Sequence, residues 1–200
     1  MKERPIIFST EMVKAILEGR KTQTRRVVKP QFKILHAVYK DASIETELIS
    51  RTGDQLIHSP YGKVGDRLWV RETLRWSKVG TPTRYAVDDC PVFRDGETPS
   101  EWPFKTQILP SRFMPRWASR LTLEIAEVKV ERLQEIELVD IEDEGIIISE
   151  ELMALPNHKG KYLAIQQLFI DLWNFLNAKH GYPWESNPFC WVISFKKVGN

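Results

Sequence analysis

The chain has 200 residues, with 29 lysines and arginines against 27 aspartates and glutamates, and a net charge of +2. A hydrophobic fraction of 42% is typical of a soluble globular protein and excludes a largely disordered chain. The near balance of charges excludes a highly basic, histone-like nucleic-acid protein, so attraction to phosphate depends on local clusters of cations. The length fits one domain with a full hydrophobic core.

Cysteine usage and hydropathy predict a cytoplasmic protein. Cys90 and Cys190 are far apart and lack the spacing of a zinc site. The charged amino terminus leads into only a short apolar stretch, so no signal peptide is predicted. Segment 162–178 is the most apolar long segment, but its polar residues forbid a membrane span. We therefore expect a cytoplasmic protein without a membrane partner.

The first predicted helix spans Thr10 to Glu18. Ser9 and Thr10 are good N-cap residues, and Gly19 can close the helix at its carboxyl end. Apolar residues recur at helical spacing between these two signals. Segment 20–26 contains no apolar residue and is predicted to be extended as it leaves the helix.

Three later segments have the pattern of strands. Residues 67–73 alternate in polarity after a glycine-containing turn, and residues 121–131 alternate over nearly their whole length. Residues 189–195 are strongly β-prone. Between the first two strands, segment 77–115 carries six prolines and little periodicity, which predicts a long insertion.

Two helices are predicted in the second half, a short acidic one at 138–146 and a longer one at 161–179 that ends near Gly181. The apolar residues of the longer helix recur at helical spacing: Ile165, Leu168, Phe169, Leu172, Phe175 and Leu176. Strands interleaved with helices, without a glycine-rich nucleotide loop, favour a mixed α+β barrel over a doubly wound sheet.

The strongest local charge asymmetry lies between residues 14 and 33. Its cations are Lys14, Arg20, Lys21, Arg25, Arg26, Lys29 and Lys33. Guanidinium and ammonium groups hold phosphates, so this segment predicts phosphate binding, with a solvated polar connector as the alternative. Trp69 and Trp76 lie on or near a predicted strand and are candidates for stacking on bases, although most tryptophans pack in cores.

Lys21 is a candidate nucleophile or base. It follows a helix end, and neighbouring arginines should depress the pKa of its amine. Thr22 and Thr24 offer hydroxyl groups, and the acidic run 142–144 could supply a carboxylate for proton transfer. Lys21 and Thr24 would face opposite sides of a regular strand, so their convergence needs a bend. An ordinary exposed lysine is the alternative.

Three segments together resemble the activating signal cointegrator homology (ASCH) family, in particular its longer bacterial and phage-associated members. They are residues 8–26 with Gly-Arg-Lys-Thr-Gln-Thr-Arg-Arg, residues 65–72 with Gly-Asp-Arg-Leu-Trp-Val-Arg-Glu, and residues 123–145. The resemblance implies a single α+β domain at 1–200, a small PUA-like β-barrel with surrounding helices and an insertion at about 77–115. It also implies RNA or a modified nucleoside as the partner.

One branch of that family is an amidohydrolase that removes the acetyl group from N4-acetylcytidine with a lysine, a threonine and a glutamate. Lys21 and Thr24 fall on its Lys-x-x-Thr motif, and Glu144 is the candidate glutamate, in competition with Glu142, Asp143 and Glu72. The reaction needs no metal and no cofactor. The residues expected to bind substrate or nucleic acid are Arg20, Thr22, Arg25, Arg26, Trp69 and Glu72.

Three alternatives stay open at this point. The first is a non-catalytic RNA-binding module, and the second is an RNA-cleaving nuclease of the same family. The third is a prophage accessory protein whose insertion recruits a protein partner.

Overall fold

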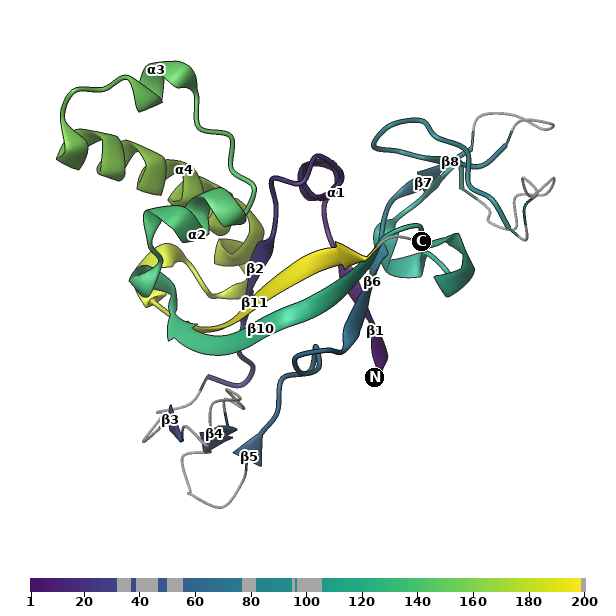
Figure 1. The fold of residues 1–200 in the computed structure, drawn as a ribbon, viewed down its shortest axis with the longest axis horizontal. Helices are drawn as coiled ribbons and strands as arrows, with labels where there is room; N and C mark the ends of the chain where they lie inside the picture. The colour runs from purple at the N-terminus through teal and green to yellow at the C-terminus, as the bar shows by residue number, and fades with distance from the viewer. Residues whose placement is uncertain are drawn as a thin grey trace.

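The computed structural model describes residues 1–31, 37–38, 47–49, 56–76, 82–94, 96 and 106–198, which form an α+β arrangement (Figure 1). The main sheet has the order β1-β6-β10-β11-β2. Its strands are β1 (Glu3–Ile7), β2 (Gln23–Val27), β6 (Arg67–Arg71), β10 (Thr122–Arg132) and β11 (Phe189–Val198). β1 and β6 are parallel, and the other neighbours are antiparallel. The α+β class is thus confirmed, but no ladder among the described residues joins β1 to β2 to close a barrel.

Helix α1 (Thr10–Leu17) lies where the capping signals place it. The Ser9 hydroxyl accepts a hydrogen bond from the Met12 N–H at 3.3 Å. Gly19 follows the helix with φ of 76°, a left-handed conformation that glycine adopts without steric penalty. Val13 and Ile16 are buried against the main sheet. The predicted extended segment then forms β2, at the edge of the sheet.

β10 and β11 form the long antiparallel pair at the centre of the sheet (Figure 1). Leu123 and Ile125 point into the core, but the pairing register shifts between Ile125 and Glu127. Ala126 is the extra residue of this bulge, and beyond it Val128 becomes the next buried position. The residues that point into the core therefore have odd numbers before the bulge and even numbers after it. The nearly regular alternation of the sequence does not predict this change.

Helices α2 (Leu138–Asp143), α3 (Glu150–Met153) and α4 (His158–Asn177) lie at one end of the molecule (Figure 1). α4 buries one row of residues against α2 and the sheet, namely Ile165, Phe169 and Trp173. Leu168 and Phe175 were expected on this apolar face, but they lie beside the row and are 39% and 79% exposed. In the described part of the chain no helix combines the length and apolar character needed to cross a membrane.

The described part of the insertion is a small sheet with a core of its own, at the other end of the molecule from α4 (Figure 1). Strands β7 (Leu74–Arg75), β8 (Arg84–Tyr85) and β9 (Ile108–Leu109) pair in the order β8-β7-β9. The buried cluster that these strands share with neighbouring residues consists of Leu74, Tyr85, Val92, Leu109, Met114 and Ala118. The remaining insertion residues, 77–81, 95 and 97–105, lie outside the described residues. A third sheet joins β3 (Ala37–Val38), β4 (Glu47–Ile49) and β5 (Leu56–Ile57).

Candidate functional site

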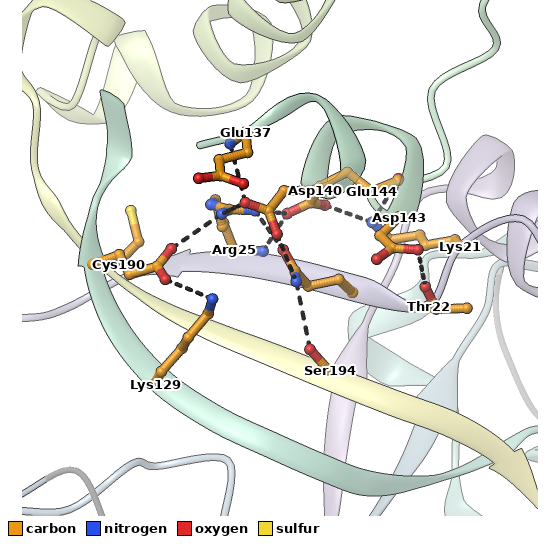
Figure 2. Close-up of polar contacts among 12 residues, drawn as sticks. Lys21, Thr22, Arg25, Lys129, Glu137, Asp140, Asp143, Glu144, Cys190 and Ser194 are labelled. Atoms are coloured by element: carbon orange, nitrogen blue, oxygen red, sulfur yellow. Dashed lines mark hydrogen bonds and ion pairs between the residues drawn. The ribbon is translucent and has the colours of Figure 1, made fainter. Parts of the chain in front are cut away.

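Lys21 and Glu144 form an ion pair in the interior of the protein (Figure 2). The Lys21 Nζ lies 2.6 Å from Glu144 Oε2 and also donates a hydrogen bond to the Glu144 carbonyl oxygen at 2.8 Å. The Lys21 side chain has no exposed surface, and the Glu144 side chain is 5% exposed. The structure therefore brings together two of the three residues that the Lys-x-x-Thr motif and its partner glutamate name.

Main-chain contacts between the end of α1 and the end of α2 position this pair. The Lys21 N–H donates to the Ala15 carbonyl oxygen, and the Thr22 N–H donates to the Asp143 carbonyl oxygen. Lys21 and Glu144 also form an isolated antiparallel bridge. Because these main-chain contacts fix the backbone at both residues, the fold itself sets the short distance between the two side chains.

Gly145 permits the close approach of these two segments. It has φ of 84°, and a Cβ at this position would lie 2.8 Å from Lys21 Cβ and 2.9 Å from Ala15 Cβ. Contacts this short cannot be accommodated without moving backbone, since both neighbours are Cβ atoms. A side chain at position 145 would therefore separate Lys21 from Glu144.

Gly145→Ala is expected to destabilise the protein more than Gly19→Ala does. Both positions have positive φ, which costs alanine about 1–2 kcal/mol. Only Gly145 adds a steric conflict, because a Cβ at Gly19 would meet nothing within 4 Å. Urea unfolding should show an extra loss of about 1–3 kcal/mol for Gly145→Ala. Equal losses in the two variants would contradict the close approach.

Burial is the main influence on the Lys21 amine. Removal from water lowers the pKa of Lys21 below its usual value, and the Glu144 carboxylate opposes this shift. The nearby guanidinium groups of Arg26 and Arg25 lower the pKa further. An enclosed amine whose pKa is lowered exists as a free base at a lower pH than a surface lysine, which suits it for nucleophilic or base chemistry.

The other candidate residues near the pair differ in their burial and in their hydrogen-bond partners. Thr24 is buried in β2 and lies opposite Ile193 of β11. Among the competing carboxylates, Glu142 is exposed and Asp143 accepts a hydrogen bond from the Thr22 hydroxyl at 2.6 Å. Glu144 is therefore the carboxylate of the acidic run that contacts Lys21.

Arg25 is not placed to hold a phosphate, contrary to the expectation from the basic segment. Its side chain is 1% exposed and lies among carboxylates, 2.9 Å from Asp140 and 3.2 Å from Glu131 (Figure 2). Its main-chain N–H donates to Glu144 Oε1. Gln23 also reaches Asp140, with its Nε2 donating at 3.1 Å. Arg25 thus supports the Glu144 carboxylate through the backbone, and its charge is neutralised inside the protein.

Three further predicted binding residues are also engaged within the protein. Arg20 pairs with Glu18 and donates to the Gly145 carbonyl oxygen at 2.8 Å. Trp69 is 8% exposed and is covered by arginine side chains, so its ring is not available for stacking. Glu72 is buried directly after β6 and paired with Arg120, apart from the Lys21–Glu144 pair.

A cavity of about 390 Å³ lies next to β2, and we call it the tyrosine cavity. Its lining includes Arg26, Lys29, Tyr61, Asn177, Tyr182 and Trp191. No acidic side chain is among the lining residues found in the described part of the chain. The lining therefore combines positive charge with aromatic rings.

Phe8 lies near both Lys21 and Arg26, a lining residue of the tyrosine cavity. The Arg26 guanidinium lies 5.2 Å from the centre of the Phe8 ring, and the Lys21 Nζ lies 5.7 Å from the same ring. Sequence reasoning named Arg26 and Lys29 within the basic segment but missed Asn177 and Tyr182. Asn177 ends α4 and Tyr182 follows that helix, and only the fold brings the two residues beside β2.

Comparison with protein families, with curated proteins and with solved structures gives no match for this chain. Within the described residues, no group of three or more histidine, cysteine, aspartate or glutamate side chains is arranged to hold a metal ion. The functional argument therefore depends on the geometry of the Lys21–Glu144 pair and of the tyrosine cavity.

Proposed function

We propose that this protein acts in the cytoplasm on RNA or a modified nucleoside, as an amidohydrolase that removes the acetyl group from N4-acetylcytidine. The observation that carries the proposal is the enclosed Lys21 amine, whose pKa is lowered by burial and which is hydrogen-bonded to the Glu144 carboxylate. As part of the same proposal, the main sheet and α1 are the core of an ASCH domain with a PUA-like barrel.

The reaction consumes one water molecule and yields cytidine and acetate. The neutral Lys21 amine either attacks the acetyl carbonyl carbon, forming an acetyl-lysine that water then hydrolyses to release acetate, or takes a proton from a water molecule that attacks this carbon directly. When the amide bond breaks, the exocyclic nitrogen of cytosine needs a proton, which Glu144 transfers from the nucleophile. The Thr24 hydroxyl then serves as a hydrogen-bond donor to the nucleophile or to the oxyanion that develops on the carbonyl oxygen.

The tyrosine cavity is the proposed binding place of the nucleoside. A volume of about 390 Å³ is within the usual range of small-molecule sites. Aromatic side chains such as Tyr182 offer faces to a pyrimidine ring, and Arg26 and Lys29 attract phosphate. Because Lys21 has no exposed surface, the acetyl group reaches it only when a neighbouring side chain such as Phe8 moves aside.

The second candidate function is non-catalytic binding of RNA or a nucleoside. Two observations favour it, the complete enclosure of the Lys21 side chain and the cationic, aromatic lining of the tyrosine cavity. In this case the Lys21–Glu144 pair holds α1 against α2 and performs no chemistry. The two functions differ in what they require of the Lys21 amine.

The test is incubation of the protein with N4-acetylcytidine, with cytidine and acetate measured by chromatography. We expect turnover by the wild type and a loss of about 100-fold or more in Lys21→Ala. Lys14→Ala is the matched control, because Lys14 is exposed on α1, and its turnover should stay within about twofold of wild type. No turnover at high enzyme concentration, or equal turnover by wild type and Lys21→Ala, would leave only the binding function.

A further inference from the structure

Arginines and exposed aromatic rings gather where the insertion meets β6. We call the group Arg71, Arg112, Phe113, Arg116 and Trp117 the arginine surface. Arg71 Nη1 donates to the Arg112 carbonyl oxygen at 3.0 Å. The guanidinium groups of Arg71 and Arg116 lie 4.7 Å and 5.7 Å from the centre of the Trp69 ring. One buried indole therefore contacts the guanidinium groups of two arginines.

The charge of this surface is only partly neutralised. Arg116 pairs with Glu3 at 2.8 Å. Arg71 and Arg112 have no carboxylate partner among the residues that the structure describes, and the Arg71 Nε is buried there without a hydrogen-bond partner. Arginines that are oriented but not paired with acids are suited to bind an anion that comes from outside the protein.

The rings of the arginine surface lie beside its cations. Phe113 is 60% exposed, and the Arg112 guanidinium lies 5.3 Å from the centre of its ring. Trp117 is 38% exposed, and the two rings belong to consecutive short 3-10 turns, 111–113 and 116–118. Exposed rings interleaved with cations are the combination that binds single-stranded nucleic acid, because bases stack on the rings while phosphates contact the cations.

We propose that the arginine surface binds a single strand of RNA, with phosphates on Arg71 and Arg112 and bases on Phe113 and Trp117. The inference rests on the proposed function in one respect: the modified nucleoside on which the protein acts would then be part of the bound RNA strand. A protein partner would also bury exposed rings, but two arginines without acidic partners favour a polyanion.

The experiment measures binding of a fluorescently labelled 12-nucleotide uridine RNA by anisotropy, over a range of salt concentrations. We expect the Arg71→Gln/Arg112→Gln double variant to weaken binding at least about tenfold and to lower the slope of log K against log salt by about 1.4. Phe113→Ala should weaken binding without changing the slope. The Lys159→Gln/Lys179→Gln double variant removes the same charge from exposed positions near the two ends of α4, and it should bind within about twofold of wild type.

Unchanged binding by the arginine double variant, or no binding by the wild type at low salt, would overturn the inference. Each variant is also assayed on free N4-acetylcytidine, where the arginine double variant should turn over like the wild type. RNA binding that depends on Arg71 and Arg112 without any hydrolysis would support the inference and overturn the amidohydrolase. Hydrolysis of the free nucleoside, together with RNA binding that the double variant leaves unchanged, would support the amidohydrolase and overturn the inference.

Discussion

Lys21→Arg is expected to lower kcat/KM for N4-acetylcytidine by about 100- to 10,000-fold, the usual contribution of a positioned acid or base. Arginine keeps the positive charge and can still donate hydrogen bonds to Glu144, but its guanidinium does not lose a proton at any accessible pH. The variant therefore separates a proton-transfer or nucleophilic role of Lys21 from a purely ionic one. Circular dichroism and urea unfolding show whether the variant is folded, and Lys14→Arg, at an exposed position of α1, is the matched control.

The pH dependence of the wild type supplies the second part of this test. Burial lowers the pKa of Lys21 from its usual value of 10.5, so the free amine forms at a lower pH than in the unfolded chain. We expect kcat/KM to rise with pH through the lowered pKa and to level off before 10.5. Activity that persists in Lys21→Arg, or a rate independent of pH across this range, would contradict the catalytic role.

Stability should depend on pH in the same window. Between the lowered pKa of Lys21 and 10.5 the unfolded chain holds a proton on this lysine that the folded chain does not. The contribution of this group to the free energy of unfolding therefore rises with pH there. Below the lowered pKa the lysine is protonated in both states and its full burial penalty applies.

The local elements of the site could be predicted because their signals are local. The Ser9 cap and Gly19 define α1, and a polar run after a helix end leads to the edge strand β2. The partner of Lys21 lies 123 residues away, so no spacing identifies it, and the acidic run offered three neighbouring carboxylates. The left-handed φ of Gly145, where an added Cβ would collide with Lys21, and the bridge between residues 21 and 144 place Glu144 against the amine.

Which cations of the basic segment are buried could not be predicted from composition. Alternation along β2 directs Gln23 and Arg25 toward Asp140 of α2, whereas Arg26 reaches the tyrosine cavity. Which of two adjacent arginines is buried depends on the acids that α2 and β10 bring to β2, and those acids are more than 100 residues away. The sequence does not predict the small sheet of the insertion, because strands of two residues, such as β8, are too short to show a period.

Arg120→Met is expected to destabilise the protein by about 3–5 kcal/mol at neutral pH, as the loss of one partner from a buried ion pair does. Arg120 donates to both carboxylate oxygens of Glu72, at 3.1 Å and 2.9 Å, and to Asp88 at 2.7 Å. The Glu72 side chain is 2% exposed, so no water can replace the lost donors. This pair joins the end of β6 to the residues that precede β10, and urea unfolding measures its loss.

The stability lost in Arg120→Met should become larger as pH rises. Burial already raises the pKa of Glu72, and the hydrogen bonds and charge of Arg120 oppose that shift. Without Arg120 the pKa rises further, so the folded variant keeps Glu72 protonated at a pH where the unfolded chain is ionised. Stability of the variant relative to wild type therefore falls as pH rises through the raised pKa of Glu72 in the wild type, which lies above the usual glutamate value of 4.5. Below it, only the lost hydrogen bonds remain, about 1–3 kcal/mol.

Two further variants separate charge burial from a general loss of packing. Glu72→Met/Arg120→Met removes both charges and should recover most of the stability at neutral pH, because a buried pair replaced by apolar residues of similar size is often neutral. Arg75→Met breaks a pair with Asp89 on the same small sheet, where both side chains are about half exposed, and should cost less than about 1 kcal/mol. If Arg120→Met and the double variant were equally unstable at every pH, the cause would be lost packing on the Tyr85 ring, 3.8 Å from the guanidinium, and not an unpaired Glu72 charge.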